Sequence, residues 1–357
     1  MDELASIIIV LYNSSRYIEA CINSVMAQDY PHEIIAVDNN STDNSCQIIR
    51  EKFPSVRLIE SGENAGYGAG NNEGVKHARG KYIVILNPDT KVERGWLREL
   101  IKPLKSGDKI ITTPKILTYN GEVINTCGAI NHFSGLSFTR GLGDPSEMQS
   151  CKEHISGFSG CSFAIRRDHY ISLGGFDRKF FMYNEDADFS WRANLNGFKI
   201  LYTPRSVVKH DYILKMTPKK LYYLEKGRYT ILRKYLSTNC LLMLVPSLLI
   251  TEILTFGFAS RQGIEYLYNK ILAMIHGLTD DITPVKGNSH LLISSLYDKI
   301  PDDQLTSYRL DVIFIRLCNI IYIWNYAFLK AMRMSYLKRI EHKLLRRSDR
   351  LLHSPVD

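Results

Sequence analysis

Two acidic groups, far apart in the chain, could carry out chemistry. Asp89 follows a short apolar run, and Glu185, Asp186 and Asp188 cluster farther along. A carboxylate is a good oxygen ligand for Mg²⁺ or Mn²⁺ held against a diphosphate. Clustered carboxylates raise one another's pKa, which helps one of them take a proton near neutral pH. The two groups together predict a diphosphate-binding centre and a general base.

The sequence before Asp89 predicts that it lies at the carboxyl end of a buried strand. Tyr82 to Leu86 is a continuous apolar run of β-branched and aromatic residues. Pro88 ends the run, because proline cannot donate to a strand ladder. In open α/β sheets, ligands bind at this edge. The alternative is a solvated turn, since Asn, Pro, Asp and Thr are ordinary turn residues.

Strands expected at 6–11, 34–37, 56–59 and 81–86 alternate with helical patterns, which predicts βαβ units and a mostly parallel sheet. The loops after these strands share one edge, so their polar residues should meet around one ligand. These residues are Tyr12, Asn13, Asp38, Asn64 and Asp89. Asp38 can accept hydrogen bonds from a nucleobase or ribose. Its alternative role is to cap the next helix.

The glycine-rich stretch 64–74 is not a dinucleotide fingerprint, because Asn71 stands where the last glycine is required. A glycine-rich turn that opens a helix still allows backbone N–H groups to approach a phosphate or sugar. The alternative for Gly68 and Gly70 is close packing of the helix.

The following part of the chain is expected to form the acceptor side. A hairpin is predicted around Asn120-Gly121, which is a strong two-residue turn signal. Residues 131–153 predict a long loop that borders the sugar or acceptor pocket. The acids at 185–188 begin a predicted helix, where capping is the alternative role of Glu185 and Asp186. Arg228 suits a bidentate phosphate contact, and its alternative is a solvated basic face.

Four segments together resemble family 2 glycosyltransferases with a GT-A fold, most closely the rhamnosyltransferase-like branch. They are S-I-I-I-V-L-Y-N, V-D-N-N-S-T-D-N-S, N-x-G-Y-G-A-G-N-N-x-G and L-N-P-D-T. The resemblance implies a nucleotide-diphosphate sugar donor, either dTDP-rhamnose or a UDP-sugar. It implies Asp38 near the base and Asp89 on a Mg²⁺ or Mn²⁺ ion. Asn87 stands where the family often has the first Asp of D-x-D, so the metal site has one charge fewer.

The same resemblance assigns the remaining roles. Asp186 matches the family's usual base, with Glu185 as second choice, and His210 matches a metal or diphosphate contact. The predicted metal ligands are Asp89 and His210. The predicted donor-binding residues are Tyr12, Asn13, Asp38, Asn64, Asn87, Asp89 and Arg228.

The expected activity is inverting transfer of a sugar to a hydroxyl of a glycan or a lipid-linked acceptor. One alternative is a nucleotidyltransferase that makes a sugar nucleotide. It would need a glycine- and arginine-rich phosphate loop after the first strand, where this chain has Tyr12-Asn13-Ser14-Ser15. A second alternative is a non-catalytic partner that docks other transferases to the membrane. Retention of Asp89, Glu185 and Asp186 argues against it.

The composition divides the chain into a GT-A domain at 1–236 and a mainly helical region at 237–357. Residues 241–259 and 312–331 are apolar, and a basic tail follows at 338–350. Basic residues beside an apolar helix predict attachment to an anionic membrane surface, as a peripheral protein rather than a spanning one. The alternatives are a soluble helical bundle and a homodimer interface.

The sequence also favours a cytoplasmic location at the inner face of the cell membrane. Seven scattered cysteines without a C-x-x-C pair indicate a thiol-reducing compartment and no zinc site. The start of the chain has no basic segment followed by a cleavable apolar one. No nucleic-acid partner is expected.

Overall fold

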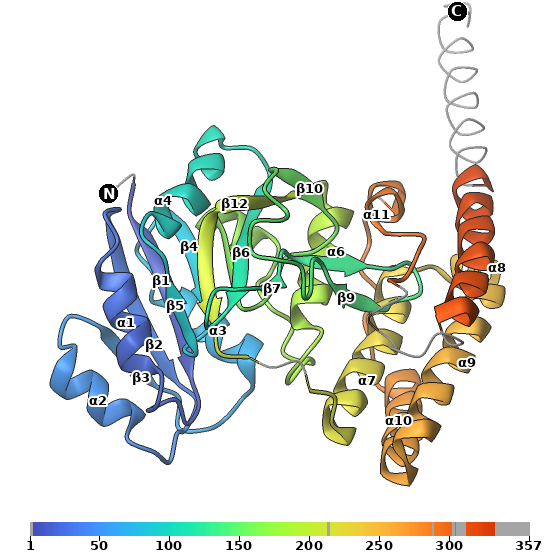
Figure 1. The fold of residues 1–357 in the computed structure, drawn as a ribbon, viewed down its shortest axis with the longest axis horizontal. Helices are drawn as coiled ribbons and strands as arrows, with labels where there is room; N and C mark the ends of the chain where they lie inside the picture. The colour runs from blue at the N-terminus through green and yellow to red at the C-terminus, as the bar shows by residue number, and fades with distance from the viewer. Residues whose placement is uncertain (1–2, 213–214, 288, 302–303, 305–311, 333–357) are drawn as a thin grey trace, which may run out of the picture.

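A computed structural model describes residues 3–212, 215–287, 289–301, 304 and 312–332 (Figure 1). The strands are β1 Ala5–Leu11, β2 His32–Asp38, β3 Arg57–Glu60, β4 Tyr82–Leu86, β5 Thr90–Val92, β6 Ile110–Thr118, β7 Ile124–Thr126, β8 Ala129–Asn131, β9 Ser137–Thr139, β10 Glu153–Ile155, β11 Ser162–Arg166 and β12 Lys199–His210. The helices are α1 Ile18–Met26, α2 Ser45–Lys52, α3 Tyr67–Lys76, α4 Trp96–Ile101, α5 Arg167–Ser172, α6 Glu185–Leu195, α7 Pro218–Tyr235, α8 Thr238–Met243, α9 Val245–Gln262, α10 Ile264–Thr279 and α11 Ser289–Ser295, with a 3₁₀ turn, η1, at Lys102–Ser106. A further helix spans Val312–Met332.

One ten-stranded sheet runs through the first half in the order β10-β12-β6-β11-β4-β1-β2-β3, with β5 beside β12 and β7 beside β6. The pairs β1/β2, β1/β4, β2/β3 and β6/β12 are parallel. The antiparallel strand β11 joins β4 to β6. The predicted mixed, mostly parallel sheet is therefore confirmed.

The strand directions bring distant residues to one edge of the sheet. Strand β11 is antiparallel to both β4 and β6, so β6 runs in the same direction as β4. Strand β12 is parallel to β6 and therefore runs in that direction too. The carboxyl end of β12 therefore lies at the same edge as that of β4. The short strand β5 turns back from this edge and pairs with β12 in the register His210↔Thr90.

Apolar side chains cover both faces of the sheet, which explains why the central strands are almost wholly hydrophobic. Ile7, Ile9 and Leu11 of β1 pack into one core, and Ile8 and Val10 pack into the other. All seven residues of β1 and all five of β4 are buried. This packing fixes the strands that end at the candidate site.

A third core joins the helical region to the catalytic half. Phe133 and Trp191 pack in it with Leu292 and Tyr322. The predicted domain boundary falls between α7 and α8, yet this core contains residues from both sides of it. The division at residue 236 remains a prediction.

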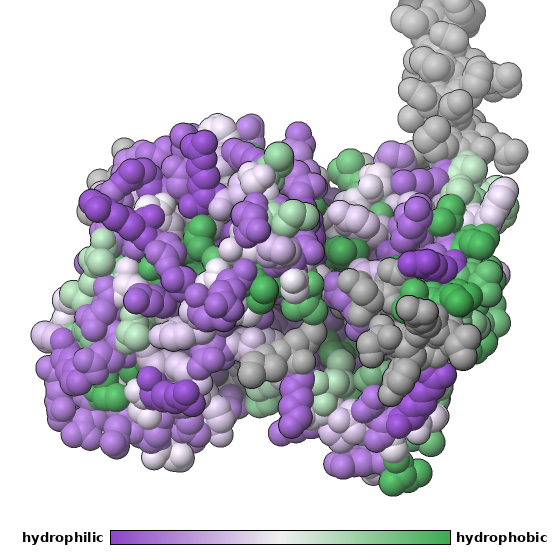
Figure 2. All heavy atoms as spheres, in the orientation of Figure 1, coloured by the Kyte–Doolittle hydropathy of each residue, from purple (hydrophilic) through white to green (hydrophobic). Residues whose placement is uncertain are grey.

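The helical side of the molecule presents many apolar side chains to solvent (Figure 2). The Val312–Met332 helix is long and apolar enough to cross a membrane by length and composition, and 28% of its most apolar window is buried. The predicted loop at 131–153 contains the last residue of β8, all of β9 and the first residue of β10. The basic tail at 338–350 lies outside the described residues.

The glycine-rich helix α3 packs directly on the sheet. A Cβ atom at Gly70 would lie 2.8 Å from Val10 Cγ1, and one at Gly74 would lie 2.4 Å from Ile8 Cγ2. At Gly70 the structure thus shows close packing of the helix, which was the alternative role for this glycine. Gly68 is equally close to Phe176 Cβ, at 2.9 Å.

Gly74→Ala should lower the free energy of unfolding by about 1–3 kcal/mol, because the added methyl group overpacks α3 against β1. The matched control is Gly257→Ala within α9, where an added Cβ meets no atom within 4 Å. The control should raise stability by about 0.5–1 kcal/mol through helix propensity. Equal effects in urea unfolding would contradict this packing role.

Candidate active site

The two acidic groups are connected through the short turn Ser159–Cys161. The backbone N–H of Gly160 donates to Asp186 Oδ2 at 2.9 Å. The next residue, Cys161, accepts at 2.9 Å from the backbone N–H of Asn87. Asn87 and Asp186 also line the same cavity. The structure thus brings Asn87, Glu185 and Asp186 to one cavity, whereas Asp89 is not among its lining residues.

His210 reaches this site from the end of β12. Its Nε2 lies 3.2 Å from Asp89 Oδ1, and the backbone N–H of Asp211 donates to Asp89 O at 2.9 Å. His210 is 5% exposed and stacks on Tyr212, with a centroid separation of 5.3 Å. Burial alone would lower the pKa of His210, but Cys161 and the Asp89 carboxylate raise it to about 10.

The residues around Asp89 suit a divalent cation. Asn87 Oδ1 is buried without a hydrogen-bond partner among the described residues, and the buried Asp89 Oδ1 and His210 Nε2 have only each other, at 3.2 Å. The described residues contain no cluster of three or more His, Cys, Asp or Glu side chains that could hold a metal. Mg²⁺ is commonly held by only one or two protein carboxylates together with substrate phosphates and water. The donor set therefore fits a cation bound jointly with a diphosphate.

Glu185 and Asp186 begin α6, as the sequence predicts, and both line the cavity. Burial raises the pKa of Glu185 to about 8, and the neighbouring Asp186 carboxylate contributes to the rise. Burial also raises the pKa of Asp186, but the backbone N–H groups of Gly160 and Ala187 oppose this rise by donating to its carboxylate. Two backbone N–H groups thus stabilise the ionised form of Asp186, whereas Glu185 Oε2 has no hydrogen-bond partner among the described residues.

Asp188 has a different role. It is fully buried, and it accepts from Lys234 at 2.7 Å, from Tyr235 at 2.9 Å and from Arg192 at 3.1 Å. These partners use both of its oxygens. Asp188 thus anchors α6 to α7 rather than facing the cavity.

The predicted nucleotide-binding residues lie at the carboxyl ends of β1, β2 and β3, outside the cavity lining. Asp38 accepts from the backbone N–H of Ser41 through Oδ2, while its buried Oδ1 has no partner among the described residues. Asn13 bridges to the same loop by accepting from the N–H of Thr42. Tyr12 is 53% exposed, and Asn64 accepts from the N–H of Gly66. These residues therefore lie in the loops at the carboxyl ends of β1, β2 and β3.

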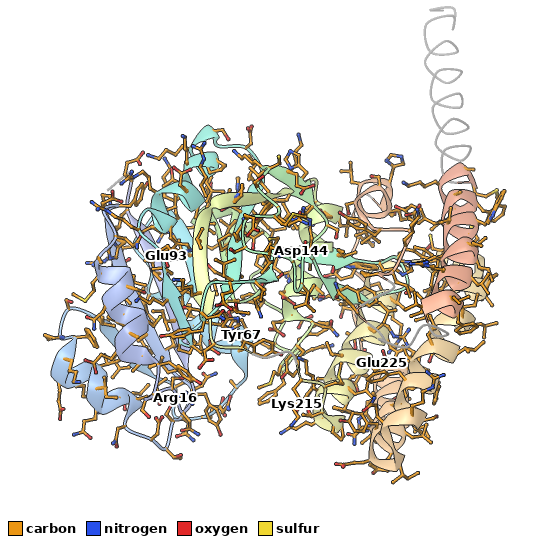
Figure 3. All side chains as sticks on the ribbon, in the orientation of Figure 1. Arg16, Tyr67, Glu93, Asp144, Lys215 and Glu225 are labelled. Atoms are coloured by element: carbon orange, nitrogen blue, oxygen red, sulfur yellow. The ribbon has the colours of Figure 1, made fainter. Side chains whose placement is uncertain are left out.

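A cavity of about 1250 Å³ extends from the Asp186 end towards the helical region. Figure 3 marks Tyr67 beside the sheet and Glu225 on α7, both of which line it. The lining of the cavity is mainly apolar away from the acidic end. It includes Leu136, Phe138, Leu221, Leu224, Leu254 and Phe258.

Arg228 lines this cavity but is held by two carboxylates. Its Nη2 donates to Glu225 at 2.8 Å and to Glu252 at 2.6 Å. Lys270, which is fully buried, pairs with the same two glutamates. Two positive and two negative charges therefore balance inside the helical region. The structure thus gives Arg228 a network role, and its donor contact remains a prediction.

Sequence reasoning missed two residues of the cavity. Lys220 is 6% exposed, donates to the hydroxyl of Tyr212 and forms no ion pair with a described carboxylate. Tyr67 donates to Gly160 O at 2.6 Å and so supports the turn that holds Asp186. The basic run at 215–234 and the Tyr inside the glycine-rich motif were the available signals.

Comparison with known proteins gives a consistent family. Residues 6–174 match the model "Glycosyl transferase family 2". The chain is 25% identical over 239 residues to poly-beta-1,6-N-acetyl-D-glucosamine synthase of Staphylococcus epidermidis, covering 65% of this chain and 57% of that protein. It is 23% identical over 235 residues to N-acetylglucosaminyl-diphospho-decaprenol L-rhamnosyltransferase of Mycobacterium tuberculosis, covering 59% of this chain and 76% of that protein.

Solved structures show the same fold. Residues 1–349 of S. aureus TarS align with a TM-score of 0.53 at 17% identity, covering 93% of this chain and 91% of that one. GalNAc-T7, solved with UDP, GalNAc and Mn²⁺, aligns with a TM-score of 0.55 at 18% identity, covering 69% of this chain and 51% of that one. The GT-A fold with a helical region after it is confirmed.

Glu185→Gln should change how stability depends on pH. Folding raises the pKa of Glu185 from 4.5 to about 8, so the folded protein holds this proton more tightly than the unfolded chain does. The contribution of the protonated group to the free energy of unfolding is therefore fully present below pH 4.5. That contribution is lost as pH rises through about 8. The variant should therefore gain about 1–4 kcal/mol relative to the wild type between pH 5 and pH 9.

Thermal unfolding across this pH range provides the measurement. Glu63→Gln, at an exposed glutamate, is the matched control and should follow the wild-type curve. Parallel curves for Glu185→Gln and the wild type would show that the carboxyl group does not hold a proton in the fold.

Proposed function

We propose, from the family 2 glycosyltransferase domain that residues 6–174 form, that the chain transfers a sugar from a nucleotide-diphosphate donor to an acceptor hydroxyl with inversion. The observation that carries the proposal is the connection of Asp186 and Asn87 through one turn, beside the pair Asp89 and His210. This arrangement sets a proton acceptor opposite a diphosphate site.

The donor's nucleoside would lie against the loops that carry Tyr12, Asn13, Asp38 and Asn64. The orphaned Asp38 Oδ1 is free to accept a hydrogen bond from the base or ribose. The diphosphate would then extend towards Asn87 and Asp89 at the end of β4. The sugar would enter the cavity beside Asp186.

Asp89 and His210, with the amide oxygen of Asn87, would hold a divalent cation. Mg²⁺ or Mn²⁺ bound there would offset the negative charge of the leaving diphosphate. The chain itself aligns the donor along the sheet edge and excludes water from a buried site. Such positioning and charge stabilisation supply much of the rate in glycosyl transfer.

Asp186 would take the proton of the acceptor hydroxyl. As that oxygen bonds to the anomeric carbon, the bond from this carbon to the diphosphate breaks, and the leaving group keeps the bonding electrons. Glu185, with its raised pKa, stays protonated at neutral pH and leaves Asp186 as the ionised partner. Its proton also limits repulsion between the two acids and the donor's phosphates.

The two relatives favour an acceptor in cell-envelope polysaccharide synthesis. One is named for a diphospho-decaprenol acceptor and the other for a poly-N-acetylglucosamine product. The chain spans 57% of the length of the poly-N-acetylglucosamine synthase and 76% of that of the rhamnosyltransferase. We place the enzyme at the inner face of the cell membrane, where a lipid-linked or glycan acceptor would be available.

Asp186→Asn should abolish transfer while donor affinity stays within about twofold, because the amide keeps the shape of the carboxylate but cannot take a proton. Product formation from a panel of nucleotide-sugars, and donor binding by calorimetry, provide the measurements. The exposed Asp108→Asn is the control and should transfer at the wild-type rate. Normal transfer by Asp186→Asn would refute its role as base.

Asp89→Asn should remove the cation-dependent part of nucleotide binding. For the wild type, UDP or dTDP with Mn²⁺ should raise the melting temperature more than either component alone, because a ligand that binds only the folded state stabilises it. The variant should lose this synergy and keep a small cation-independent shift. An unchanged synergy would place the cation elsewhere. The Asp108→Asn protein again serves as the control.

A further inference from the structure

The cavity at the active site is larger and more apolar than sugar transfer requires. Its volume of about 1250 Å³ exceeds the usual 300–1,000 Å³ of a small-molecule site. The predicted nucleotide-binding residues Tyr12, Asn13, Asp38 and Asn64 do not line it. Most of its volume is therefore left for the acceptor.

The residue types along the cavity change from one end to the other. Glu185, Asp186 and His210 line the sheet end, whereas Leu254, Phe258 and Ile315 line the helical end. Sugar hydroxyls require hydrogen-bond partners when they leave water, and an apolar wall offers none. A hydrocarbon chain gains free energy on such a wall in proportion to the apolar area it buries.

The helical end opens at an apolar surface. Ile253 of α9 is 60% exposed and Phe314 is 46% exposed, and both line the cavity. The Val312–Met332 helix buries Cys318, Tyr322 and Tyr326 against the protein. Its outward face carries Leu317, Ile320, Trp324 and Phe328, and hydrophobic residues gather on this side of the molecule in Figure 2. This helix has the length and composition of a membrane segment.

A cation lies near the sheet end, because Lys220 donates to Tyr212, which stacks on His210. Lys220 lines the cavity, is 6% exposed and has no ion pair with a described carboxylate. Tyr183 and Tyr212 flank its ammonium group at 5.0 and 5.1 Å from their ring centroids. An uncompensated buried cation is costly unless an anion joins it. An anionic linker between a sugar and a lipid would supply that charge.

We infer that the cavity binds a lipid-linked acceptor whose hydrocarbon chain lies between α9 and the Val312–Met332 helix. The sugar hydroxyl reaches Asp186, the phosphate linker faces Lys220, and the chain leaves past Ile253 and Phe314 into the membrane. This inference deepens the proposed function and rests on it. The exposed apolar face of the Val312–Met332 helix would then lie in the inner leaflet of the membrane, where lipid shields it from water.

Gly257 provides the test, because it lines the cavity on α9 and a Cβ atom there meets no neighbour within 4 Å. Gly257→Leu fills the apolar arm and favours the helix, since leucine has the higher helix propensity. The acceptors are an N-acetylglucosaminyl-diphospho lipid with a long polyprenyl chain and the same diphospho-sugar with a short soluble alkyl chain. The variant should lower the ratio of long-chain to short-chain kcat/KM by about tenfold or more.

Ser260→Leu is the matched control, because it adds the same side chain at an exposed position of α9 outside the cavity lining. Its ratio should equal that of the wild type. An unchanged ratio in Gly257→Leu, or an equal drop in both variants, would overturn the inference.

A binding experiment separates failure of this inference from failure of the proposed transfer. A long-chain polyprenyl diphosphate with a diazirine at its tail end is photolysed with the full-length protein in detergent, and labelled peptides are mapped. Labels should fall on α9 and on the Val312–Met332 helix, and Gly257→Leu should reduce them. Labelling there without any transfer would overturn the proposed function alone. Transfer with labelling elsewhere would overturn the lipid route alone.

Discussion

The site depends on the hydrogen bonds of one short turn. Gly160 donates to Asp186 while Cys161 accepts from Asn87, so residues 159–161 set the separation between the base and the end of β4. The turn precedes β11, the strand that reverses direction within the sheet. A carboxylate held by a backbone N–H has little freedom to reorient. The position of Asp186 is thus set at the sheet edge and not by the helical region.

Electrostatics ties helices α7, α9 and α10 to one another. Glu225 and Arg228 on α7, Glu252 on α9 and Lys270 on α10 form one buried network with balanced charges. Breaking one member would leave an uncompensated charge in an apolar surrounding, which costs about 3–5 kcal/mol. A network of this kind contributes more to one fixed arrangement of helices than to net stability. It forms the wall of the cavity from which the lipid route is inferred.

The sequence carried most of the information about the sheet edge but much less about the helical half. Asp89 and Asp186 could be paired because each has a local signal. Asp89 follows a buried strand that ends at a proline, and Asp186 belongs to a run of acids at the start of a helix. His210 could be placed only by resemblance, since its position beside Asp89 depends on β5 pairing with β12 in one register. The partners of Arg228 could not be predicted, because Glu252 and Lys270 come from helices whose packing has no local sequence signature. The apolar composition did mark residues 312–331, but it did not predict that Tyr326 is buried or that Asn319 bonds to Ile300.

Under the lipid route inferred above, the Val312–Met332 helix would give a lipid-linked acceptor access to the site without new catalytic chemistry. Its aromatic face packs on the β8/β9 hairpin, where Phe133 stacks on Tyr326 at 5.2 Å, so the helix is a fixed part of the fold. The opposite face is left apolar and exposed, an arrangement that water disfavours by roughly 25 cal/mol per Å². A membrane removes this penalty and at the same time delivers an acceptor along the direction in which the cavity opens. The same surface can therefore attach the enzyme and align its substrate, while the proton transfer remains with Asp186 at the sheet edge.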